Sequence, residues 1–319
     1  MFFSHRTYAR IVNASPEKGL DVLQVVTALT GRKRGVSTAV IYWLAIFPTV
    51  LIYGISITNT MDSFIVNQLH GSQLPRAVLA TLCIGVLTAA FALGKKATPW
   101  FANIPVYPLI VALAAVSKFA LDVQKARKGD VAATERQVPK IELITATLLL
   151  VFTMFFVWSC TLTLGAGGLE EARAQNIPVL SYFANVTNTP FMAIMTPIVA
   201  ICDIASSHFG HMLGAEEGTA YLIRVMAPET AKRIDDRLLD YAGYLFVFVT
   251  GVVVAVITPS ILDLISVVGG LFMTFLVYLV PTLLFRKATA FRHYANRPDV
   301  LFVGVMGVVI MAVTVWQML

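Results

Sequence analysis

The stretch LITATLLLVFTMFFVWSCTLTL, residues 143–164, carries no charged side chain. A run of about 20 apolar residues in an α-helix matches the roughly 30 Å thickness of the hydrocarbon core of a bilayer. Inside lipid every backbone N–H and C=O needs a partner within its own segment, and an α-helix provides these partners. The stretch therefore predicts a membrane-spanning helix.

The rest of the chain has the same character. Of its 319 residues, 57% are hydrophobic and 13% are charged, against roughly 25% charged in an ordinary soluble domain. The apolar residues form long blocks and not the alternating strands of a β-barrel. We predict an all-α, polytopic transmembrane helical bundle in one domain over residues 1–319. Its apolar blocks are 36–58, 76–93, 101–121, 143–164, 191–207, 241–258, 261–285 and 300–318.

The net charge of +6 fits the Lys and Arg content of cytoplasmic loops. We therefore predict the lipid bilayer as a partner and no nucleic acid. Three cysteines, Cys83, Cys160 and Cys202, lie in apolar blocks and are interpreted as small core residues, not as disulfide partners. The oligomeric state is left open by the sequence.

Lys and Arg are distributed unevenly between the blocks. Segment 1–35 holds six of them, and segment 59–75 holds none. Because Lys and Arg accumulate in cytoplasmic loops, we predict that the N-terminus lies inside and that the first loop lies outside.

The connection at residues 118–140 does not fit eight simple spans. It holds six Lys and Arg residues, yet alternation would place it outside. Either a hydrophobic crossing is absent just before it, or the block 101–121 is re-entrant and does not fully span. Pro99, Pro105 and Pro108 interrupt that block, as in a half-inserted segment. The residues alone leave both explanations open.

An acidic residue lies inside the apolar block 191–207. A carboxylate at the centre of a membrane helix costs about 2.5–3.5 kcal/mol, so we expect Asp203 to face the bundle interior or water. One interpretation makes Asp203 a carrier of a proton or cation. The other makes it a polar anchor to a neighbouring helix.

Hydroxyl groups supply further candidates for binding a substrate or an ion. Ser206 and Ser207 follow Asp203 by one helical turn. Their hydroxyls could equally return hydrogen bonds to the preceding turn. Thr58 and Asn59, at the end of the first block, are candidates for contact with a substrate.

Two imidazoles follow the serines. We expect His211, in the run GHMLG, to end the helix near the cytoplasmic face and to cap or gate it, with Gly210 and Gly214 permitting the turn. His208 and His211 with Asp203 provide too few ligands for a zinc site. We predict no metal and no cofactor. No nucleophile–base pair is evident either, so we do not predict an enzyme.

Several longer runs resemble a known family. They are IFPTVLIYGISITNTMDSFIVNQL (46–69), MFFVWSCTLTL (154–164), QNIPVLSYFANVTNTPFMAIMTPIVAI (175–201), FGHMLGAEEG (209–218) and TPSILDLISVVGG (258–270). They resemble the bacterial hydroxy/aromatic amino acid permease family, in its serine and threonine transporter branch. The resemblance covers most of the chain.

The resemblance implies an inverted-repeat amino acid transporter fold, similar to that of the leucine transporter, in the cytoplasmic (inner) membrane of a bacterium. It implies import of serine or threonine by proton symport, with sodium as the other coupling ion to consider. Ser206 occupies a position where the family typically carries a lysine.

The resemblance also implies that some family spans have no counterpart in this chain. Aligned with the family, the chain lacks the first span, most of the second, and the sixth. In this fold the first and sixth spans are broken helices that form the substrate and ion site. The alternative interpretation is therefore a truncated, non-transporting remnant or a membrane scaffold of the same family.

Overall fold

The structure is a computed structural model that describes residues 2–13, 22–94, 131–187, 189–228, 235–287 and 294–319. All regular elements within these ranges are helices, and no strand occurs among them. Seven of these helices are long and apolar enough to cross a membrane. The prediction of an all-α polytopic membrane protein is confirmed.

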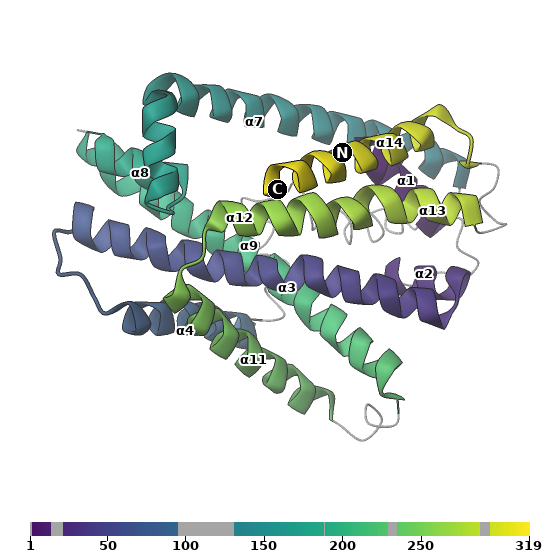
Figure 1. The fold of residues 1–319 in the computed structure, drawn as a ribbon, viewed down its shortest axis with the longest axis horizontal. Helices are drawn as coiled ribbons and strands as arrows, with labels where there is room; N and C mark the ends of the chain where they lie inside the picture. The colour runs from purple at the N-terminus through teal and green to yellow at the C-terminus, as the bar shows by residue number, and fades with distance from the viewer. Residues whose placement is uncertain (1, 14–21, 95–130, 188, 229–234, 288–293) are drawn as a thin grey trace.

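The bounds of the helices show how the apolar blocks are arranged (Figure 1). The N-terminal part contains α1 (Phe2–Asn13), α2 (Val22–Thr30), α3 (Arg32–Ser63), the π-helical segment η1 (Phe64–Gln68) and α4 (Arg76–Gly94). The C-terminal part contains α7 (Val131–Ala174), α8 (Val179–Val186), α9 (Pro190–Met226), α11 (Asp236–Ile257), α12 (Ile261–Val267), η2 (Val268–Met273), η3 (Phe275–Leu279), α13 (Val280–Lys287) and α14 (Pro298–Met318). The predicted block 101–121 lies outside the described residues.

Helix α3 lies at the centre of the bundle and packs most extensively on α9. Its residues Ile46 and Val50 are buried in one cluster with Phe91 of α4, Met212 of α9 and Tyr244 of α11. Since lipid tails are as apolar as these side chains, the hydrophobic effect does not hold helices together within a bilayer. Close van der Waals packing along α3 therefore stabilises the bundle.

The prediction that a helix ends near His211 is wrong. Helix α9 continues without a break to Met226. A Cβ atom added at Gly218 would lie 3.1 Å from the ring of Tyr42 on α3, and one at Gly214 would lie 3.3 Å from the hydroxyl of Tyr42. These glycines therefore permit close packing of α9 on α3, and the helix makes no turn there.

Helix α7 differs from the other helices. At Gly165 the backbone has φ 66° and ψ −176°, which is not a helical conformation, so the helix changes direction there. Figure 1 shows a long arm along the top of the view and a short arm that descends beside α8. No residue is buried in the most apolar window of Leu143–Ala174, whereas α3 buries half of its own.

The segment α12–η2–η3–α13 forms one continuous span over Ile261–Lys287. Gly270 lies in its π-helical part, where a Cβ atom would approach Thr314 Oγ1 of α14 to 2.3 Å. The absence of a side chain at Gly270 therefore sets how closely α14 can approach this span.

Helix α1 joins the two ends of the described chain. Arg10 forms a 2.8 Å ion pair with Asp299 of α14, and both side chains are largely buried. The Tyr8 hydroxyl donates a hydrogen bond to the Leu276 carbonyl. Burial raises the pKa of the Tyr8 phenol, so the hydroxyl keeps the proton that this bond requires.

Candidate functional site

Three polar side chains of α9 form a stripe at four-residue spacing: Asp203, Ser207 and His211. Residues four apart lie on adjacent turns of the same side of a helix. This α9 stripe faces the middle of α3, where Tyr53 is located. Asp203 is exposed, whereas His211 is buried, so the stripe leads from an open position to an enclosed one.

Tyr53 of α3 lies against the α9 stripe. It forms a side-chain hydrogen bond with Ser207 and lies within electrostatic range of the Asp203 carboxylate. Its ring is packed on the imidazole of His211, with 5.1 Å between the ring centroids and 56° between the ring planes. Tyr53 was not among the residues predicted for the site. The signal in the sequence was a phenol inside an apolar block, since a buried Tyr hydroxyl usually needs a partner.

The hydrogen bond of His211 defines its tautomer. His211 Nδ1 lies 2.8 Å from the carbonyl oxygen of Ser207. A carbonyl oxygen only accepts, so Nδ1 carries the proton and Nε2 of the neutral ring carries a lone pair. Nε2 is buried and has no hydrogen-bond partner among the residues described. An unpaired acceptor in this position is unusual, because the large majority of buried polar atoms are paired.

His208 and Ser206 are also buried but lie off the α9 stripe. His208 lies against the backbone of Val50 on α3. At about 100° per residue, Ser206 lies on the opposite side of Asp203 from Ser207. Its hydroxyl has no partner within the described part of the chain. Ser206 therefore lies beside the α9 stripe and not on it.

Thr58 and Asn59 lie in a second polar cluster, further along α3. The Thr58 hydroxyl donates to the Gly54 carbonyl of its own helix at 2.8 Å. The Asn59 amide donates to the carbonyl of Asn176 and accepts a hydrogen bond from Arg76. Both side chains thus have partners in the protein, and the cluster ties helices together.

The remaining partners show what that cluster connects. Arg76, at the start of α4, also donates from Nε to the Ala255 carbonyl of α11 at 2.8 Å. The Asn176 side chain accepts from the backbone N–H of Ile261 at 2.8 Å and donates to the Pro259 carbonyl at 3.0 Å. This Asn59 junction therefore links α3 and α4 to the α7–α8 and α11–α12 connections.

Comparison with known proteins identifies the family. No protein-family model matches the chain. Serine transporter SdaC of Escherichia coli strain K12 is 31% identical over 356 aligned residues, which cover 97% of this chain and 82% of the relative. Serine transporter SdaC of Escherichia coli O157:H7 matches with the same figures, and that of Shigella flexneri is 30% identical over the same shares. The chain belongs to the SdaC serine transporter family.

The SdaC relatives contain residues that have no counterpart in this chain. The 356 aligned positions exceed the 319 residues of the chain. The aligned regions otherwise cover nearly all of this chain, including both the α9 stripe and the Asn59 junction.

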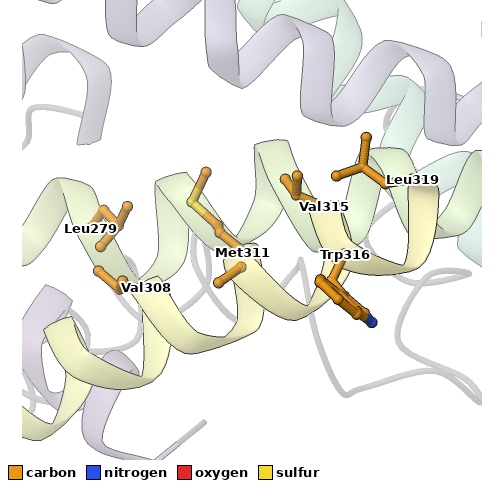
Figure 2. Close-up of a pocket in the computed structure, with 7 residues that line it drawn as sticks. Leu279, Val308, Met311, Val315, Trp316 and Leu319 are labelled. Atoms are coloured by element: carbon orange, nitrogen blue, oxygen red, sulfur yellow. The ribbon is translucent and has the colours of Figure 1, made fainter.

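An open groove near the C-terminus offers little to a polar ligand in this SdaC family member. Figure 2 shows its lining between η3 and α14, where Leu279, Val308, Met311 and Val315 lie along the groove and Trp316 lies at one end. These side chains carry no charged group, and a zwitterionic ligand needs polar groups to orient it. The α9 stripe is therefore the better candidate site.

Proposed function

We propose that this chain imports serine and related hydroxy amino acids across the cytoplasmic membrane of a bacterium. The observation that carries the proposal is the 31% identity to a serine transporter over 97% of the chain. Seven helices of spanning length and composition support it. In this proposal those helices cross the bilayer and the N-terminus lies inside.

The proposed mechanism is proton symport, with sodium as the competing coupling ion. The α9 stripe is the proposed face for substrate or ion, because it combines an exposed carboxylate, Asp203, with a buried His211 Nε2 that has no hydrogen-bond partner among the described residues. Ser206 lies nearby on α9. Thr58 and Asn59 support the site through the packing of α3, since their hydrogen bonds are made within the protein.

Uptake into liposomes tests the proposal. The purified chain is reconstituted, and uptake of labelled L-serine is measured with an inward proton gradient, with an inward sodium gradient and with neither. We expect concentrative uptake with the proton gradient, competition by unlabelled threonine, and none by an acidic amino acid. Uptake no greater than that of empty liposomes would overturn the transport proposal. Uptake driven only by the sodium gradient would show that sodium, and not the proton, is the coupling ion.

A second candidate function is a non-transporting scaffold of the same family. Two observations favour it: no residue is buried in the most apolar window of α7, and the SdaC relatives carry residues without a counterpart here. The scaffold function predicts a folded protein, with a cooperative thermal transition in detergent, that binds no labelled serine at millimolar concentration. Saturable serine binding would rule this function out.

A further inference from the structure

We propose that the α9 stripe and Tyr53 together recognise a hydroxy amino acid through both of its donor groups. In this arrangement Asp203 binds the protonated amine, and His211 Nε2 accepts a hydrogen bond from the side-chain hydroxyl. The inference rests on the proposed transport of serine-type amino acids. It assigns the two recognition steps to separate residues.

The unpaired atom of His211 determines what it can bind. Its Nδ1 donates to the Ser207 carbonyl at 2.8 Å, which leaves Nε2 as an acceptor. Nε2 is buried without a hydrogen-bond partner in the described residues. A hydroxyl group supplies the missing donor and remains neutral in an enclosed position. An apolar side chain of the same size supplies none.

Asp203 determines the other end of the ligand. Its carboxylate is exposed on an apolar helix, and no ion pair joins it to a Lys or Arg in the described ranges. A carboxylate at membrane depth requires a cation or a set of donors. A primary ammonium carries three N–H donors and a positive charge, so it meets both requirements.

The spacing of the two residues suits a small amino acid. Asp203 and His211 are eight residues apart, so their Cα atoms are separated by about 12 Å along the helix axis. The His211 ring leans back along α9 toward Ser207, whose carbonyl it binds, which shortens the distance that a ligand between the two residues has to span. Tyr53 and Ser207 lie between the two ends and are already hydrogen-bonded to each other.

Equilibrium binding of labelled L-serine to the purified full-length chain in lipid nanodiscs tests the inference. The competitors are unlabelled L-serine and two analogues. L-Alanine lacks the side-chain hydroxyl, and N-acetyl-L-serine lacks the charged amine. In the unaltered chain we expect L-serine to compete at least about tenfold better than either analogue.

Two substitutions should then give opposite patterns. His211→Phe keeps a ring against Tyr53 but removes the acceptor, so we expect the preference for serine over alanine to fall about tenfold while the preference over N-acetyl-L-serine persists. In Asp203→Asn the preference over N-acetyl-L-serine should fall, and the preference for serine over alanine should persist. Matched controls are His208→Phe, the same change one turn away and off the stripe, and Asp263→Asn, in the first turn of α12; both should leave the two preferences unchanged.

The outcomes separate this inference from the proposed function. Suppose that the unaltered chain binds serine and that both preferences in His211→Phe and in Asp203→Asn equal those of the unaltered chain. This result would overturn the inference and leave the proposed serine transport standing. An equal loss of both preferences in each variant would also overturn it, because that pattern indicates a structural role. Absence of serine binding by the unaltered chain would overturn both.

Discussion

At the scale of single residues, Asn59 shows how one amide can hold several helices. Its side chain is paired at both its donor and its acceptor, to Asn176 and Arg76. Those partners in turn bind the carbonyl of Ala255 and the backbone N–H of Ile261. Within a bilayer such polar contacts are costly to leave unmade, because no water is present to replace them.

Substitution of Asn59 by alanine should therefore destabilise the protein. Asn59→Ala leaves the Arg76 guanidinium and the Asn176 carbonyl each short of a partner, and a buried group left unpaired costs about 1–3 kcal/mol. Thermal unfolding of the purified protein in detergent should show a clear fall in Tm. Asn67→Ala is the control, since the Asn67 amide donates its hydrogen bond to the Ser63 hydroxyl on an exposed surface. Equal Tm values for the two variants would contradict the prediction.

The sequence shows part of this residue-scale chemistry. Asp203, Ser207 and His211 could be selected from their spacing and their types within an apolar block. Tyr53 could not be linked to them, because no spacing relates residues on helices so distant in the chain. Asn59 was selected as a substrate contact, and its hydrogen bonds within the junction became visible only when the loops around Asn176 and Ile261 were placed.

At the scale of elements, glycine positions control how closely helices pack. Gly269 and Gly270 are neighbours in η2, yet only Gly270 faces α14. A Cβ atom at Gly270 would lie 2.3 Å from Thr314 Oγ1 and 2.9 Å from Thr314 Cβ, whereas one at Gly269 would meet nothing within 4 Å. Rotation of the Thr314 side chain cannot relieve the second contact, because the Cβ position is fixed by the backbone.

Alanine substitutions at these two neighbours should therefore differ. Gly270→Ala should push α14 away from the span and lower the Tm measured in detergent, since overpacking typically costs about 1–3 kcal/mol. Gly269→Ala adds the same methyl group to the same element and should leave the Tm unchanged or slightly raised, because Ala favours helices over Gly. A Gly270→Ala protein as stable as Gly269→Ala would show that α14 is not held at this distance.

The presence of the helices could be predicted from the sequence more easily than the positions where they end. Runs of uncharged residues predict helices because the length of apolar chain needed to cross lipid is fixed. The end of α9 was predicted wrongly, because Gly210 and Gly214 were interpreted as turn residues. The contact of Gly214 with Tyr42 on α3 explains the error, since a glycine that permits close packing and one that permits a turn look identical in a sequence.

At the scale of the whole molecule, the orientation of α3 across the membrane fixes the side on which the segments before and after it lie. The helix and η1 cover Arg32–Gln68, and three consecutive basic residues, Arg32, Lys33 and Arg34, begin it. The connection after η1 contains no Lys or Arg before Arg76. The positive-inside rule therefore predicts that the start of α3 lies in the cytoplasm and that the connection at 69–75 lies outside.

Cysteine labelling of intact cells measures this orientation. In a chain whose three native cysteines are replaced by alanine, we expect Ser72→Cys to react with a membrane-impermeant maleimide in intact cells. Lys33→Cys should react only after permeabilisation. Both positions are exposed in the structure, so a lack of reaction reports sidedness and not burial. The reverse labelling pattern would show the opposite orientation and contradict the proposal that the N-terminus lies inside.

The ion pair between Arg10 and Asp299 has a consequence for biosynthesis. Arg10 leaves the ribosome long before Asp299, and at typical synthesis rates the interval is on the order of tens of seconds. Until Asp299 is synthesised, Arg10 lacks its acidic partner on α14. Tyr8 likewise lacks its hydrogen-bond acceptor until Leu276 is synthesised. Helix α1 can therefore complete these contacts only after the polypeptide has been synthesised through Asp299, so this end of the bundle closes after the spans that precede α14 have been made.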